Sequence, residues 1–261
     1  MPNPLRKHFM VLRVPLLLSL GSILLYAGFA YDLVRTDFIK LISLYAALFF
    51  LSTKLIQTNQ WNFKFLVVVG VLFRLVFLWA TPNLSQDFYR FIWDGNLVIS
   101  GINPYLYTPN EILNWKEIPI ANHTLLFEGM GALSAKHFSN YPPFNQALFA
   151  IAALFGGKSI LGSVIILRLQ IILADIGLLY FGRKLLDILG KPKQTIFWYF
   201  LNPLVIIELT GNLHFEGVML FFMVWALYLI VKKKWSPAAP NNAHTILTKL
   251  LQIHSMPYIL R

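Results

Sequence analysis

Phe65-Leu66-Val67-Val68-Val69-Gly70-Val71-Leu72-Phe73-Arg74-Leu75-Val76-Phe77-Leu78-Trp79-Ala80-Thr81 is followed, after five intervening residues, by Asp87-Phe88-Tyr89-Arg90-Phe91-Ile92-Trp93-Asp94-Gly95. The first run is apolar over a length that can cross a bilayer as a helix. The second run places two carboxylates, an arginine and several aromatic rings directly beyond it. Charged residues make up only 13% of the chain, so their concentration at a membrane boundary calls for a chemical explanation.

The composition of the 261 residues is that of a polytopic membrane protein. Hydrophobic residues make up 57% of the chain, and the mean hydropathy is +0.62. The net charge of +11 comes from lysines and arginines that flank apolar runs. This position is typical of loops that are retained on the cytoplasmic side of a membrane, and it argues against nucleic-acid binding. The absence of cysteine excludes disulfides, thiol catalysis and cysteine-ligated metal.

Long apolar segments predict an all-α polytopic helical bundle of about six spans. The segment 194–209 is short and carries Asn202-Pro203, a break that neighbouring helices can accommodate inside a membrane. Residues 144–156 are apolar but too short to cross, so we expect a re-entrant or interfacial helix there. The expected spans are 14–31, 38–56, 65–81, 160–181, 194–209 and 217–231.

The distribution of basic residues sets the expected orientation. A cytoplasmic N-terminus, which carries Arg6, Lys7 and Arg13, places residues 82–143 outside as a long non-cytoplasmic loop. A re-entrant 144–156 segment then keeps the basic residues near 183–193 and at 232–234 inside. We therefore expect a transmembrane domain over residues 1–231 and a cytoplasmic or interfacial tail over 232–261.

Three charged residues of the outer loop are spaced to share one face of a helix. Asp87 and Arg90 are three apart, and Arg90 and Asp94 are four apart, so the three side chains can pair. An ordinary interfacial helix with a solvated charged face would show the same spacing. Asp87 lies nearest the expected membrane exit, and we take it as the candidate general base.

A second polar cluster, Thr210-Gly211-Asn212-Leu213-His214-Phe215-Glu216, falls on the same face of the membrane in this topology. His214 could bind phosphate or carry a proton near neutral pH, whereas an ordinary solvated loop would also be polar. His214 and Glu216 are two potential ligands and do not define a metal site.

Three charged residues lie inside expected spans. A charge at the centre of a membrane helix costs about 2.5–3.5 kcal/mol on insertion scales, so Arg74, Arg168 and Asp175 should face protein or a cavity. An interhelical salt bridge and a functional role both fit. In the functional interpretation, Arg168 binds an anionic headgroup and Asp175 orients it.

Two motifs together resemble bacterial mannosyltransferases of the GT-C superfamily. The first joins residues 84–95 to Gly101-Ile102-Asn103-Pro104-Tyr105, and the second runs from Asn202-Pro203 through Glu208 to Gly217. The resemblance implies a multi-spanning enzyme that uses a polyprenyl-phosphate sugar, with the outer-loop carboxylate as base, which corresponds to Asp87. Relatives often carry an acidic residue where Gln86 stands. They are commonly longer, so we expect a C-terminally truncated member.

The resemblance implies a glycosyltransferase of the bacterial inner membrane that moves a sugar, with mannose favoured, to a lipid or glycan acceptor. Transfer would take place on the non-cytoplasmic face and invert the sugar's anomeric centre. It would require no cofactor or metal, although a role for a divalent cation is left open. The candidate residues are Asp87 as base; Arg90, Arg168 and His214 for the donor phosphate; Asp94, Asp175 and Glu216 as supports; and Tyr89, Trp93 and Tyr105 for stacking on the sugar.

Two other functions fit parts of the sequence. A transporter or lipid flippase would use the intramembrane charges as a substrate path. It also predicts paired repeats with matching helix breaks, and Asn202-Pro203 is the one such break we find. A catalytically incomplete GT-C fragment, acting with a second subunit, would fit the expected truncation.

Overall fold

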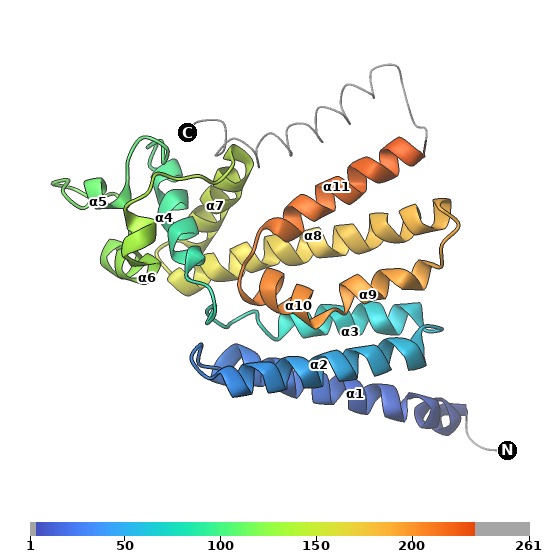
Figure 1. The fold of residues 1–261 in the computed structure, drawn as a ribbon. Coiled ribbons are helices and arrows are strands. Elements are labelled where there is room, and N and C mark those ends of the chain that lie inside the picture. Colours follow the sequence, from blue (N-terminus) through green and yellow to red (C-terminus); the bar gives the residue numbers. More distant parts are fainter. Residues whose placement is uncertain (1–3, 233–261) are drawn as a thin grey trace.

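The computed structural model describes residues 4–232, and within them every regular element is a helix, as predicted. The predicted tail beyond Lys232 lies outside the described residues. Three helices open the chain: α1 (Pro4–Asp32), α2 (Phe38–Asn59) and α3 (Phe63–Leu75). They lie side by side in Figure 1. Side-chain caps begin two of them, since Asp37 accepts from the amide of Lys40 and Asn62 from that of Phe65.

About half of the predicted outer loop is helical. It contains α4 (Asp87–Ile99), the short α5 (Pro109–Ile112) and α6 (His123–Ala135), which is kinked at Gly131. With α7 (Pro143–Gly156), these helices form a group at one end of the molecule (Figure 1). The predicted short apolar helix at 144–156 is therefore confirmed, and it packs against α4 and α8.

The remaining chain runs away from this end and comes back to it. The long α8 (Ile160–Ile188) leads to the far end, and the chain then returns through a series of short helices (Figure 1). A 212–215 turn follows near α4 and α7, and α11 (Glu216–Val231) runs back along α8. The short helices of the return path are η1 (Lys193–Ile196), α9 (Phe197–Phe200), α10 (Pro203–Val205) and the π-helix η2 (Ile206–Gly211).

Three helices of the described chain are long and apolar enough to cross a membrane singly: Arg13–Asp32, Phe38–Asn59 and Ile160–Ile188. A bent pair, Pro203–Gly211 with Glu216–Val231, qualifies as a fourth when the two are taken together across their 116° bend. The third predicted span is shorter than expected, because α3 ends at Leu75 and turns follow to Trp79. The total of six spans stays a prediction.

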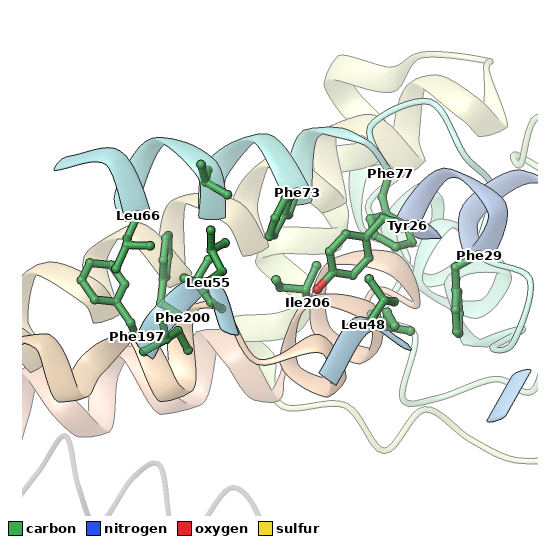
Figure 2. Packing of buried hydrophobic residues seen from close by; sticks show 14 of the residues in the cluster. Tyr26, Phe29, Leu48, Leu55, Leu66, Phe73, Phe77, Phe197, Phe200 and Ile206 are labelled. Atoms are coloured by element: carbon green, nitrogen blue, oxygen red, sulfur yellow. The ribbon is translucent and has the colours of Figure 1, made fainter. Parts of the chain in front are cut away.

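Two apolar clusters hold the helices together. The first joins α1, α2 and α3 to the 196–207 segment, and Figure 2 shows Phe73 and Phe77 beside Tyr26 in it. The second joins α4, α6, α7 and α8 to the residues around Phe215. Because α8 and the returning chain contribute to both clusters, the outer helices are fixed directly to the bundle.

Gly95 allows α4 and α7 to approach until their backbones almost touch. A Cβ atom built at this position would lie 2.3 Å from the carbonyl oxygen of Phe149. Backbone cannot rotate away as a side chain can, so we expect Gly95→Ala to lower the free energy of unfolding by about 1–3 kcal/mol. Thermal unfolding in detergent would measure the loss. Gly28→Ala is the matched control, because nothing lies within 4 Å of its Cβ and stability should be kept or slightly raised.

Candidate active site

Asp87 is the first residue of α4 and is exposed. Its amide donates to the Ser85 hydroxyl at 3.3 Å, and no hydrogen bond to its carboxylate occurs within residues 4–232. The start of a helix favours a negative charge, because the first amides point toward it. Asp87 is thus placed as an accessible carboxylate, and its role as general base stays a prediction.

Asp94 lies two turns further along α4 and is completely buried. One carboxylate oxygen accepts from Arg90 Nε at 2.8 Å, which confirms the predicted i,i+4 pair. The other oxygen accepts from the Ser139 hydroxyl at 2.5 Å and from Gln146 Nε2 at 3.0 Å. Asp94 therefore ties α4 to the 136–142 loop and to α7, and its supporting role in the site stays a prediction.

Arg90 has a similar anchoring position. Besides Asp94, its guanidinium donates to the carbonyl oxygens of Ser134 at 2.8 Å and His137 at 3.0 Å, and the residue is 3% exposed. These contacts hold the end of α6 against α4. A phosphate role for Arg90 stays a prediction, and the present partners of its guanidinium belong to the protein.

The second polar cluster is built on a π-turn. Asn202 caps α10 by accepting from the amide of Leu204, and η2 closes with a 2.8 Å bond from the Asn212 amide to the carbonyl of Ile207. Leu213 then takes a φ of +61°, a left-handed conformation that a branched side chain adopts at a cost. Single π-turns and strained residues recur at functional sites. The residue they present is His214.

Glu208 holds this cluster together and was not among the predicted site residues. Its carboxylate accepts from the Tyr45 hydroxyl at 2.9 Å and from Asn212 Nδ2 at 3.0 Å, and it lies 3.5 Å from His214 Nδ1. The signal that could have identified it was its position, since it is the one carboxylate in the otherwise apolar predicted span 194–209.

Arg168 connects the residues that lead into α4 with the turn that leads to His214. It is fully buried and donates to the carbonyls of Thr210 (2.8 Å) and Gly211 (3.1 Å) on one side. On the other side it donates to those of Leu78 (3.1 Å) and Ala80 (2.7 Å). The guanidinium thus clamps residues 78–80, which lead into the outer loop, against the turn that leads to His214. All its observed partners are carbonyls, so its predicted contact with phosphate stays a prediction.

Aromatic packing brings the two motifs together a second time. The ring of Phe91 on α4 lies 5.6 Å from that of Phe215, the neighbour of His214, and 4.5 Å from that of Phe149 on α7. Tyr141 completes this group, with its ring 5.0 Å from Phe91. The α4 motif and the His214 motif therefore share one packed group of rings.

Tyr141 also reports on the charges around the site. Burial raises the pKa of the Tyr141 phenol, and the carboxylates of Asp87, Asp94 and Glu216 raise it further. Carboxylates of both motifs are therefore within electrostatic reach of this hydroxyl. Its sequence context, directly before Pro142-Pro143, gave no sign of this role.

The three aromatic residues predicted to stack on sugar differ in exposure. Tyr105 is 36% exposed, and its hydroxyl donates to the carbonyl of Tyr141 at 2.5 Å; burial, with a smaller effect of Asp94, raises its pKa to about 12. Tyr89 is half-buried and packs against Phe88. Trp93 is fully buried in the second cluster, so its ring is closed off from a ligand.

Asp175 has a different partner from the one predicted. It accepts from Arg74 Nε at 2.8 Å and from the Tyr199 hydroxyl at 3.0 Å, and both members of the ion pair are fully buried. Arg168 is engaged elsewhere, so the expectation that Asp175 orients Arg168 was wrong. The alternative interpretation, an interhelical salt bridge, describes the pair. Within the described chain no three His, Asp or Glu side chains gather in a way that could hold a metal ion.

Sequence similarity to known proteins identifies the family of this chain. Residues 14–260 match the family described as alpha-(1->6)-mannopyranosyltransferase, N-terminal domain. The chain is 25% identical over 156 residues, 59% of its length, to alpha-(1->6)-mannopyranosyltransferase A of Mycobacterium tuberculosis. It is 26% identical over 167 residues, 61% of its length, to alpha-(1->6)-mannopyranosyltransferase B of Corynebacterium glutamicum.

The matched region covers 28% and 27% of these two relatives, so the similarity concerns less than a third of their length. No solved structure matches the chain. The family match includes both motifs and nearly the whole sequence, and the predicted resemblance to GT-C mannosyltransferases is confirmed. The chain belongs to the alpha-(1->6)-mannopyranosyltransferase family, within its N-terminal domain.

Proposed function

We propose that this chain carries a mannosyltransferase site that moves mannose from a polyprenyl-phosphate donor to a lipid or glycan acceptor. The proposal rests mainly on the Arg168 clamp, which fixes the approach to Asp87 against the turn that presents His214. An exposed carboxylate and a partly exposed imidazole then lie at one end of the bundle. They supply the base and the phosphate-binding group that transfer from a sugar phosphate needs.

The basic residues support a non-cytoplasmic site. The end of the bundle away from α4 and α7, where α3 and η1 begin (Figure 1), includes Lys64 of α3, Lys193 of η1 and Lys191 just before η1. Arg183 stands 5.0 Å over the ring of Phe63, which places the end of α8 beside the start of α3. Lysine and arginine are retained on the cytoplasmic side, so the opposite end, with Asp87, would face outward. In this orientation we propose a multi-pass protein with about six membrane crossings.

In the proposed reaction, Asp87 accepts the proton of an acceptor hydroxyl as its oxygen bonds to the anomeric carbon. The bond from that carbon to the phosphate oxygen breaks, and its electron pair leaves with the polyprenyl phosphate. A single displacement of this kind inverts the anomeric centre. Asp87 then releases its proton to water, and His214 stabilises the charge that develops on the leaving phosphate. Arg90 and Arg168 are buried, and their role is to hold Asp87 and His214 in fixed positions relative to each other.

The remaining parts of the substrate have candidate surfaces. Tyr105 and Tyr89 offer aromatic faces for the sugar, and Asp94 and Glu216 support the surroundings of the base. The outer face of α7 exposes Ile151, Leu154 and Phe155, which could border the polyprenyl chain. No cofactor enters these steps.

The direct test is an assay with membranes that contain the chain and a radiolabelled polyprenyl-phosphate mannose. We expect label to appear in a lipid or glycan product, and membranes without the chain to give none. Movement of the labelled donor across sealed vesicles without any glycosidic product would contradict the proposal and favour a flippase.

A further inference from the structure

The carboxylate of Glu208 has a partner on each oxygen. Oε1 accepts from Tyr45 on α2, and Oε2 accepts from Asn212 and faces His214 Nδ1 at 3.5 Å. These contacts fix the carboxylate from three directions. Yet the side chain is 32% exposed and that of His214 is 34% exposed, so the pair remains open to a ligand.

The backbone around the pair is arranged to keep His214 in this position. The amide of His214 donates to the carbonyl of Glu208 at 3.3 Å, and the left-handed Leu213 between them is fully buried. A buried leucine holds this unfavourable conformation only where the surrounding packing imposes it. The histidine is therefore presented by a rigid turn and not by a loose loop.

We propose that Glu208 is the positioning residue of His214, and that the pair forms the subsite for the phosphate of the polyprenyl donor. With Nδ1–H directed to Glu208, the ring is oriented and the charge of an imidazolium is compensated. Its Nε2–H is then left to donate to a phosphate oxygen. The inference rests on the proposed function and adds to it a residue that acts through His214.

The surface beside the pair favours a phosphate that carries a lipid chain. Tyr45 lies on α2, and Ile42 and Phe49 are three residues before it and four after it on the same side of that helix. Ile42 is 49% exposed and Phe49 is 41% exposed, and the Phe49 ring stacks on Tyr45 at 6.4 Å. An apolar strip of a membrane-spanning helix thus leads directly to the Glu208 carboxylate.

The test is binding of farnesyl phosphate, a short polyprenyl phosphate, to the full chain in lipid nanodiscs, with farnesol as the uncharged reference. We expect Glu208→Gln and His214→Ala each to weaken farnesyl phosphate binding about tenfold and to leave farnesol binding unchanged. The double variant should bind farnesyl phosphate with the same affinity as the single variant that binds it less tightly, because both substitutions disrupt the same coupled contact. Tyr45→Phe, which frees one oxygen of Glu208, should cost about threefold.

Glu128→Gln is the matched control, an exposed carboxylate of α6 whose loss should leave binding unchanged. Independent, additive losses in the double variant, or an equal loss of farnesol binding, would overturn the positioning role. Competition by inorganic phosphate as strong as that by farnesyl phosphate would overturn the lipid assignment. Binding can be measured without turnover, so the two proposals can fail separately. If Glu208 and His214 are coupled in binding but the chain shows no transferase activity, the proposed function is rejected and the phosphate subsite is retained.

Discussion

Asp87→Asn is expected to slow mannose transfer about 10²- to 10⁴-fold, the usual contribution of a general base. Asparagine keeps the shape of the side chain but cannot take the proton of the acceptor hydroxyl. The exposed carboxylate has no hydrogen-bond donor within the described chain, so the fold should tolerate the change. Initial rates with labelled donor, at saturating acceptor, would measure the effect.

Two comparisons make this result specific to the base. The farnesyl phosphate affinity of Asp87→Asn should equal that of the unchanged protein, because the base acts on the acceptor. Glu117→Gln, which removes another exposed carboxylate from the outer segment, should keep full activity. Full activity in Asp87→Asn would remove Asp87 from the mechanism.

Asp175→Asn is expected to lower the free energy of unfolding by about 3–5 kcal/mol, the largest stability effect we predict. The change leaves the guanidinium of Arg74 buried without a counter-charge, between the carbonyls of Gly70 and Phe200 and over the Phe200 ring. Burial of an unpaired charge is costly because it gives up hydration without a compensating partner. Denaturant-induced unfolding in detergent micelles would measure the loss.

The paired substitution separates the charge from the packing. Arg74→Met combined with Asp175→Leu removes both charges and should restore much of the lost stability, since apolar side chains can replace a buried ion pair. Stability of Asp175→Asn within about 0.5 kcal/mol of the unchanged protein would show that Arg74 keeps a partner without it, contrary to the observed pairing.

Patterns within one helix were predictable from the sequence. Helical spacing identified the Arg90–Asp94 pair, and apolar length identified α1, α2, α7 and α8. Both signals depend on neighbours along one element, where geometry follows from 3.6 residues per turn. The same local spacing misled in the case of Arg168 and Asp175, because their actual partners lie on other elements.

Contacts across the bundle had no local signal. Arg74 and Asp175 are 101 residues apart, and Glu208 reaches Tyr45 across 163. Just past the early end of α3, the carbonyls of Leu78 and Ala80 accept from Arg168, which is 90 and 88 residues further along the chain. Which charge meets which partner is decided by packing, and the sequence restricts only the choice of residue types.

The most direct test of the account uses the fact that the chain contains no cysteine. An Asp87→Cys, His214→Cys double variant in intact cells would be treated with a short, membrane-impermeant bifunctional thiol reagent. We predict an intramolecular cross-link, identified by mass spectrometry, and none in an Asp87→Cys, Lys191→Cys control. A cross-link in the control but not in the first pair, or labelling of only one of positions 87 and 214 from outside, would contradict a single outward-facing site.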